Sequence, residues 1–355
     1  MSTGWGVSPV TRKQLWPVSL VILPILGASL ILVRTLHPEE KPLPLVAVLL
    51  SDDVRQPKVD GLRAGLASRG YREGENVRIT VISTKGNREE LPAAAASLLR
   101  LNPAVAVAAG SIEAITLKAA SGPRVPIVMM GLASSVESGL VGSIRHPGGN
   151  ITGVDNGHAE LTAKRLELLV TLLPQIKRVI ALYDPSVMPS RHGLRVALDA
   201  GASLGLTLIP VAIVNRQDLL EKLEALQPKA ADAILLLSTG IIEASAREIH
   251  DASIRTGIPV MGVNENDVGA GIFAAYGSSY ETQGRQSARF VAKLLQGQNA
   301  GDLPVETPDS PELVVNLGIA RRLGLHPSPV GLAFARILDV PWPEGSGTAP
   351  EGGRP

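Results

Sequence analysis

The sequence predicts an α/β protein with two doubly wound parallel-sheet lobes, and three observations lead to this fold class. The composition is 45% hydrophobic but only 3% aromatic, which is typical of α/β proteins rich in Ala, Val and Leu. Short apolar runs alternate with stretches of helical periodicity. This alternation occurs twice, and 355 residues are enough for two hydrophobic cores.

The first half of the alternation begins after a Pro-containing linker. Apolar runs predict buried parallel strands at Val46–Leu50, Val77–Ile82, Val105–Ala109 and Ile127–Met130. The first helix is indicated by Val59, Leu62 and Leu66 at helical spacing and is ended by Gly70. Two further helices are expected at Glu89–Leu101 and Ile112–Ala120.

The second half repeats the order strand by strand. Strands are expected at Val179–Tyr183, Thr207–Val211, Ala233–Leu237 and Val260–Gly262. Helices are expected at Arg191–Leu204, Leu219–Gln227 and Ile241–Arg255. The paired strand starts 46/179, 77/207, 105/233 and 127/260 lie 128 to 133 residues apart, so one βαβαβαβ unit occurs twice. Since such connections are right-handed, two open parallel sheets follow.

The remaining elements complete neither repeat, and we expect them to cross between the two lobes. They are Ile151–Val154, a helix over Leu161–Leu172, Gly271–Ala275, a helix over Ser279–Gln296, Leu313–Asn316 and a helix over Leu317–Leu323. Residues 43–153 with 277–312 are assigned to lobe 1, and residues 154–272 with 313–339 to lobe 2. The polar tail at 340–355 is expected to be disordered. Hinge positions are predicted at Gly149, Thr152, Gly153 and Gly271.

The N-terminus predicts export. Residues 14–33 carry no charge and are about the ~20 residues that a membrane helix needs. Arg12 and Lys13 precede them, which places the remainder of the chain on the periplasmic or extracellular face, tethered to the membrane. A cleaved signal peptide within residues 1–40 is the alternative, although no clear cleavage site follows the apolar run. The chain has no cysteine, which excludes a disulfide scaffold, a thiolate metal site and a lipid-modified Cys.

Several short motifs suggest chemistry that their context does not support. Gly201–Gly205 matches the G-x-S-x-G nucleophile motif, but it ends a helix instead of joining a strand to a helix. Gly269–Ala274 resembles a dinucleotide fingerprint, but it leads into a strand. The six histidines show no metal-ligand spacing. The net charge of +1 gives no indication of a nucleic-acid partner. We therefore predict no catalytic residues, no metal and no cofactor.

A ligand site is predicted from polar residues that directly follow strands. Because the carboxyl ends of parallel strands meet at one edge of a sheet, these residues line the crevice between the lobes. Free N–H groups at helix starts there suit an anionic group, and Glu265 is the expected partner of an ammonium. A small zwitterionic or anionic solute is expected, with two tyrosines as candidates to stack a ring. The site residues are Ser51, Asp52, Ser111, Ser134, Ser135, Asp155, Tyr183, Ser238, Thr239, Asn264, Glu265 and Tyr276.

Five segments in order along the chain resemble ABC transporter substrate-binding proteins of the type associated with aromatic amino acids. They are "GLRAGLASRGYREGENVRI" (61–79), "HPGGNITGV" (146–154), "AKRLELLVTLLPQIKRVIALYDP" (163–185), "AGIFAAYGSSY" (270–280) and "LPVETPDSPELVVNLGIARRLGL" (303–325). The resemblance implies a type I periplasmic-binding fold. It also implies capture of a small solute by closure of the lobes and delivery to a permease with a cytoplasmic ATPase. One departure is the loop Gly131–Val136, which replaces the Asp-Pro-Val usual in the family.

Two other function classes stay open from the residues alone. A sensing ectodomain uses the same two-lobed fold to signal through a membrane partner. An enzyme is possible on any doubly wound scaffold, because the fold does not fix the function. A repressor-type ligand domain is excluded, because a membrane-like segment replaces N-terminal DNA-binding helices.

Overall fold

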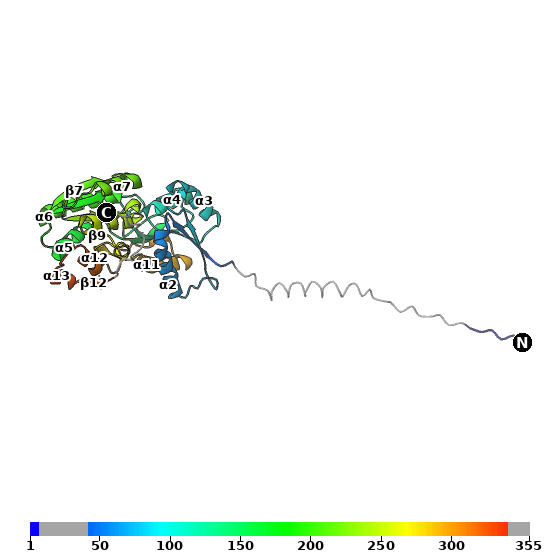
Figure 1. Ribbon diagram of the computed structural model, residues 1–355. Coiled ribbons are helices and arrows are strands. Elements are labelled where there is room, and N and C mark those ends of the chain that lie inside the picture. Colours follow the sequence, from blue (N-terminus) through cyan, green and yellow to red (C-terminus); the bar gives the residue numbers. More distant parts are fainter. Residues whose placement is uncertain (7–41, 340–355) are drawn as a thin grey trace, which may run out of the picture. The chain divides into compact units, whose positions relative to one another are not determined.

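The computed structural model describes residues 1–6 and 42–339 (Figure 1). The expected membrane segment at 14–33 and the expected disordered tail at 340–355 lie outside the described residues. No helix within the described ranges is long and apolar enough to cross a membrane. The compact unit begins at Leu43, and the two lobes described below both belong to it.

The first lobe is built on a five-stranded sheet in which every neighbouring pair is parallel. The strand order is β2-β1-β3-β4-β5, which is the doubly wound order 2-1-3-4-5. The strands are β1 (Leu45–Leu50), β2 (Arg78–Ser83), β3 (Val105–Ala108), β4 (Ile127–Leu132) and β5 (Ile151–Asp155). The helices that connect them are α2 (Gln56–Ala67), α3 (Leu91–Arg100) and α4 (Ser111–Ser121). Alternate residues of β1 enter hydrophobic clusters on opposite faces of the sheet.

The second lobe contains a seven-stranded sheet in the order β12-β11-β10-β9-β8-β6-β7. Its strands are β6 (Arg178–Tyr183), β7 (Thr207–Ala212), β8 (Ala233–Leu236), β9 (Val260–Gly262), β10 (Ala274–Gly277), β11 (Glu312–Asn316) and β12 (Ala335–Leu338). β11 runs antiparallel to β10, and the other pairs are parallel. Its longer helices are α5 (Leu161–Leu172), α6 (Met188–Leu204), α7 (Arg216–Ala225) and α9 (Ala246–Thr256). The order β7-β6-β8-β9-β10 repeats that of the first sheet, so the duplication predicted from strand spacing is confirmed.

Some elements of the second lobe differ from the expectation. The single helix expected over Ile241–Arg255 is divided at Ser245 into α8 (Gly240–Glu243) and α9. Three short elements were not predicted, namely α10 (Glu265–Gly269), α13 (Pro329–Leu332) and β12. β12 is half exposed and pairs only with β11, so it lacks the apolar run that marks a buried strand.

The chain passes between the two lobes three times. Residues 156–160 lead from β5 to α5, residues 278–279 lead from β10 to α11 (Tyr280–Leu295), and residues 306–311 lead to β11 after the short helix η3 (Ala300–Asp302). β5 pairs with β4 in the first sheet, so the expected crossing strand Ile151–Val154 belongs to lobe 1 and the crossing begins after Asp155. Gly277 lies in β10 of the second sheet, although the sequence suggested lobe 1.

The four predicted hinge residues lie outside these three crossovers. Gly153 has φ +135, and a Cβ there would lie 2.4 Å from the Met129 carbonyl oxygen, so close strand contact explains this glycine. The Thr152 hydroxyl donates to the Leu303 carbonyl at 2.7 Å. Gly271 has φ +96 and lies against His250, while a Cβ on Gly149 would meet open space. Each position therefore has its own local environment, and a hinge role stays a prediction.

Helix α11 returns to the first lobe and lies side by side with α2 (Figure 1). Glycines allow their backbones to touch: a Cβ on Gly284 would lie 1.8 Å from the Lys58 carbonyl oxygen. A Cβ on Gly61 would lie 2.0 Å from the Glu281 carbonyl oxygen. This contact fixes the beginning of α2 beside the beginning of α11, and both helix starts face the cavity described next.

Candidate functional site

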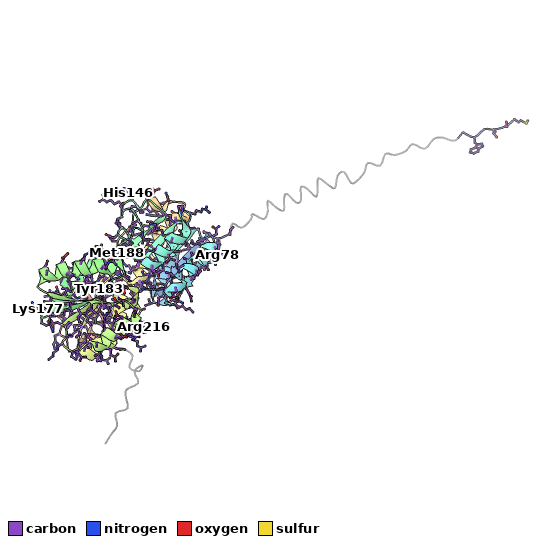
Figure 2. All side chains as sticks on the ribbon, turned by 90° about the horizontal axis from the view of Figure 1, so that it is seen from above. Arg78, His146, Lys177, Tyr183, Met188 and Arg216 are labelled. Atoms are coloured by element: carbon purple, nitrogen blue, oxygen red, sulfur yellow. The ribbon has the colours of Figure 1, made fainter. Side chains whose placement is uncertain are left out.

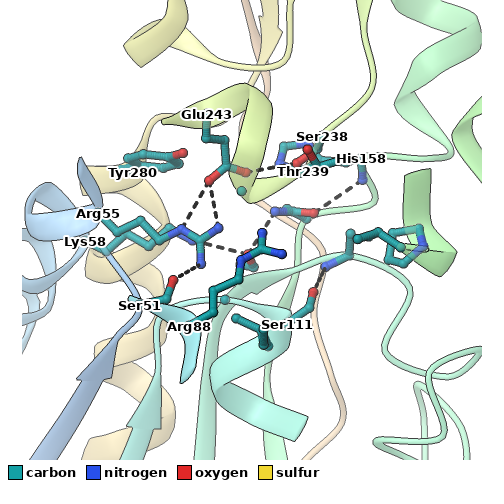
Figure 3. Close-up of a pocket in the computed structure, with 18 residues that line it drawn as sticks. Ser51, Arg55, Lys58, Arg88, Ser111, His158, Ser238, Thr239, Glu243 and Tyr280 are labelled. Carbon is teal, nitrogen blue, oxygen red and sulfur yellow. Dashed lines mark hydrogen bonds and ion pairs between the residues drawn. The ribbon is translucent and has the colours of Figure 1, made fainter. Parts of the chain in front are cut away.

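A cavity of about 110 Å³ lies between the lobes at the carboxyl ends of both sheets (Figure 3). Most of its residues follow β1 and β3 in lobe 1 and β6 and β8 in lobe 2, and the others lie at or after the ends of β2, β4, β5 and β10. β1 and β3, like β6 and β8, flank the point where the strand order of their sheet reverses, which is where doubly wound folds bind ligands. The polar lining residues are Ser51, Arg55, Lys58, Arg88, Ser111, Asn156, His158, Ser238, Thr239, Glu243 and Tyr280.

Arg55 is the central cation of this cavity, and its guanidinium is bound by the buried carboxylate of Glu113. Arg55 precedes α2, and its Nη1 donates to both oxygens of Glu113 at 2.9 and 3.1 Å. Glu113 is fully buried in the first turn of α4, and its Oε1 also accepts the Ser51 backbone N–H at 2.8 Å. Gly110 leaves room for this contact, because a Cβ there would lie 2.0 Å from Nη1. Lobe 1 therefore orients the guanidinium through Nη1.

The opposite edge of Arg55 faces Glu243 of lobe 2. Nε and Nη2 donate to the same Glu243 oxygen at 3.1 and 2.7 Å (Figure 3). The Ser238 hydroxyl donates to the other Glu243 oxygen at 3.1 Å. Both side chains of the pair are about nine-tenths buried. Burial alone would raise the pKa of Glu243, but the charge and hydrogen bonds of Arg55 lower that pKa to about 2.

Lys58 lies one turn further along α2 and is 2% exposed. Its ammonium donates to the carbonyls of Ala109, Met130 and Gly131 at 2.7, 2.7 and 3.3 Å. Ala109 directly follows β3, and Met130 and Gly131 lie near the end of β4. It also lies 5.0 Å from the centre of the Tyr280 ring. Burial, reinforced by the charge of Arg55, lowers the pKa of Lys58 to about 7.

The first crossover contributes His158, which Arg165 holds in place. Arg165 is fully buried in α5 and donates to the carbonyls of His158, Tyr276 and Val263 at 2.7, 2.9 and 3.3 Å. Burial and then the Arg165 charge lower the pKa of His158 well below its usual value. His158 is therefore a neutral imidazole at neutral pH, and this side of the cavity carries no charge from it.

A second cavity of about 150 Å³ adjoins the first and shares Ser51, Arg55, Arg88, Gly240 and Glu243 with it. It is bounded on its far side by Asp52 and Arg216. The Arg55–Glu243 pair lies between the two spaces.

Four of the residues predicted from the sequence line the first cavity, namely Ser51, Ser111, Ser238 and Thr239. Asp52 lines the second cavity. Thr239 also caps α8, accepting the Ile242 backbone N–H at 3.2 Å.

Ser134, Ser135 and Asp155 lie buried beside the cavity and do not line it. The Ser135 backbone N–H donates to Asp155 Oδ2 at 2.7 Å. The hydroxyls of both serines are buried and have no hydrogen-bond partner within the described part of the chain. The changed loop after β4 is thus tied to the end of β5 by its backbone.

The remaining predicted residues lie elsewhere in lobe 2. Tyr183, at the end of β6 (Figure 2), and Tyr276 both pack against the core of that lobe. Asn264 caps α10. Glu265 forms an ion pair with Arg336 at 2.7 Å and is partly exposed, so its carboxylate is engaged away from the cavity.

Sequence reasoning missed the charged residues of the site. It selected the first polar residues after each strand, whereas Arg55, Lys58 and Glu243 lie up to one or two helical turns later. One signal was present in the sequence: Arg55 and Lys58 lie at the N-terminal end of a helix, where the helix dipole disfavours cations. Such residues need a local anion, and Glu113 and Glu243 supply it.

One group among the described residues has the composition of a metal site. Potential ligand atoms of Glu137, Glu160 and His192 lie within 4.8 Å of one another. Both glutamates are exposed, and exposed carboxylates commonly lie this close without an ion. The group therefore does not establish a metal site.

Comparison with known proteins places this architecture in a family. The family model described as ABC transporter substrate binding protein matches residues 45–330. A tyrosine-binding protein of Clostridioides difficile (strain R20291) is 25% identical over 281 residues, covering 78% of this chain and 80% of the relative. The solved structure of a conserved domain protein from Vibrio cholerae has a TM-score of 0.78 at 25% identity, covering 84% of this chain and 99% of that one.

A second solved structure has the same fold. It is described as the ABC domain in complex with L-Trp from Streptococcus pneumonia, with a TM-score of 0.77 at 21% identity, and it covers 83% of this chain and 99% of that chain. Because the family model matches most of the chain, this protein belongs to the ABC transporter substrate-binding protein family.

Proposed function

We propose that this member of the ABC transporter substrate-binding family captures a zwitterionic α-amino acid between its lobes and delivers it to an ABC permease. The observation that carries the proposal is the opposite charge of Arg55 and Glu243 across the cavity. Lobe 1 offers a guanidinium and lobe 2 offers a carboxylate, and an α-amino acid carries the complement of both. The tyrosine-binding relative and the complex with L-Trp support this class of solute.

The mode of binding follows from the geometry of Arg55. The Nε–Nη2 edge of an arginine binds a carboxylate through two parallel hydrogen bonds. Glu243 occupies that edge, so the ligand carboxylate takes its place while Glu113 keeps the guanidinium oriented. Glu243, once released, accepts the ligand ammonium together with the Ser238 hydroxyl. A space of 110 Å³ is smaller than common ligand sites, so the lobes part to admit the ligand.

Thermal unfolding of the full chain with a panel of free amino acids tests this proposal. A ligand at ~100 times its Kd adds about 2.7 kcal/mol to the stability of the native state. We expect at least one free amino acid to give such a shift, and we expect its N-acetyl and carboxamide derivatives to give none. Arg55→Gln is expected to abolish the shift.

Arg63→Gln is the matched control, because Arg63 lies on the same helix but pairs with Glu73 outside the cavity. It should leave the shift unchanged. Equal shifts with the free amino acid and its blocked derivatives, or an undiminished shift in Arg55→Gln, would refute the proposed mode. A panel without any shift would refute amino-acid binding.

Export is the second part of the proposal. Proteins of this family normally act outside the cytoplasm, and we infer from residues 14–33 that the chain is exported and either tethered or processed. Membership of a transporter family favours delivery to a permease over a sensing role, and we expect no turnover of the bound solute. Cell fractionation with N-terminal sequencing tests the export, since a cytoplasmic chain with intact residues 1–40 would contradict it.

A further inference from the structure

The first cavity is lined by a third cationic side chain besides Arg55 and Lys58. Arg88 lies in the short helix η2 (Arg88–Glu90) and lines both the first cavity and the second. Arg55 pairs with Glu113 and Glu243, and Arg216, on the wall of the second cavity, pairs with Glu248. Arg88 is exposed, and its guanidinium has no ion pair and no hydrogen bond among the described residues 1–6 and 42–339.

The position of the Arg88 guanidinium depends on residues of both lobes. It comes from lobe 1, yet its Nη2 lies only 2.9 Å from where a Cβ on Gly240 of lobe 2 would be. Glycine at 240 therefore gives the guanidinium room to reach across the cavity. The Arg55 Nη2 lies 4.0 Å from the same point, so both guanidiniums converge at the start of α8.

A ligand bound as proposed above leaves this cation without a counter-ion. The α-carboxylate is taken by Arg55 and the α-ammonium by Glu243, whereas Arg88 faces the space in which the ligand side chain would lie. Arg88 is exposed in the structure, and a neutral side chain placed against it would displace water from an unpaired guanidinium, which is costly. An anionic side chain would instead gain a charge-assisted hydrogen bond.

The lining also offers little to an aromatic side chain. Tyr280 is the single aromatic residue among those lining the two cavities, and its ring is already in contact with the Lys58 ammonium. The two spaces, about 110 and 150 Å³, are bordered mainly by charged, hydroxyl and glycine residues. A short side chain that ends in a carboxylate suits the size of these spaces and the charge of Arg88.

We propose that the ligand is an acidic α-amino acid and that Arg88 binds its side-chain carboxylate. This inference rests on the proposed function and adds the substrate class to it. Arg88 is then the residue that determines specificity, while Arg55 and Glu243 bind the part common to all amino acids.

Calorimetric titration of the full chain with free L-glutamate, L-aspartate, L-glutamine and L-tryptophan tests this assignment. L-Glutamine is the decisive comparison, since it matches L-glutamate in size and lacks only the charge. We expect L-glutamate or L-aspartate to bind at least tenfold more tightly than L-glutamine and L-tryptophan. Arg88→Gln is expected to remove this preference by weakening the acidic ligand and leaving L-glutamine unchanged.

Arg63→Gln is the control, because Arg63 lines neither cavity and pairs with Glu73. It should preserve the ratio of affinities. Tight binding of L-glutamine or L-tryptophan with no acidic preference would overturn the role of Arg88 and leave the proposed function intact. An acidic preference that survives Arg88→Gln would also overturn that role. Absence of binding by all four amino acids would refute the proposed function and this inference with it.

Discussion

Replacement of Glu243 by Gln is the most informative change to the contact between the lobes. Glu243→Gln keeps the size of the side chain and its ability to accept a hydrogen bond, and it removes the negative charge opposite Arg55. The Glu243 carboxylate has a pKa of about 2 instead of 4.5, which corresponds to about 3 kcal/mol of stability at neutral pH. Loss of one partner of a buried pair typically costs about 3–5 kcal/mol, so the two magnitudes agree.

The stability difference between the wild type and Glu243→Gln depends on pH. A carboxyl group whose pKa is lowered by folding contributes stability above its unfolded pKa, here 4.5, and that contribution is lost as the pH falls towards 2. The wild-type chain should therefore exceed Glu243→Gln by about 3 kcal/mol at pH 7. The difference should shrink steadily between pH 4.5 and pH 2.

Urea unfolding at a series of pH values measures this difference, and small-angle X-ray scattering measures the separation of the lobes. If the lobes of the variant separate while each stays folded, the loss of stability is smaller and the radius of gyration rises. Glu248→Gln is the control, because its pair with Arg216 is more exposed and should contribute below about 1 kcal/mol. A difference that is constant with pH, or a small loss with an unchanged radius of gyration, would refute the reasoning.

Three further predictions concern the groups around the site. Burial lowers the pKa of Lys58 to about 7, so above that pH the unfolded chain binds more protons than the folded chain. The stability of the wild type relative to Lys58→Met should therefore rise from pH 7 to pH 9.5. Urea unfolding that gives the same stability difference at both pH values would contradict this. Gly284→Ala should lower stability by about 1–3 kcal/mol or more through overpacking against α2, whereas Gly149→Ala, which meets open space, should be nearly neutral in thermal melts. Arg165→Met leaves three buried carbonyls without a hydrogen bond, at a cost of about 1–3 kcal/mol each. Circular dichroism should therefore show that the variant is scarcely folded. A native-like melting temperature would show that water or a rearranged backbone satisfies these carbonyls.

The sequence predicted the architecture well because strand order and burial follow from local patterns. Six of the eight paired strands are buried apolar runs such as Leu45–Leu50, while β2 and β7 are partly exposed. The near-constant offset between the paired strands reflects a real repeat of strand order. The edge strand β12 and the short helix α10 were not predicted, because they have neither an apolar run nor enough length to show a period.

The site was predicted less completely, for a physical reason. Serines after strands, such as Ser51 and Ser111, are found by position alone. The partnership of Arg55 with Glu113 and Glu243 joins residues 58 and 188 positions apart, and only the assembled sheets bring them together. Glu265 shows the reverse case: its position after β9 suggested a role in the site, but the edge strand β12 supplies Arg336 as its partner.

In the proposed binding mode, Glu243 competes with the ligand carboxylate for the Nε–Nη2 edge of Arg55. The ligand binds only the form in which the Arg55–Glu243 pair is broken, and the apparent affinity is lowered by the fraction of molecules in that form. If the pair stabilises the other form by about 3 kcal/mol, binding is weakened about 100-fold. This sets a threshold solute concentration below which the protein stays unloaded. Residues that support the competitor, such as Ser238 behind the Glu243 carboxylate, therefore offer a means of adjusting that threshold without altering which solute is recognised.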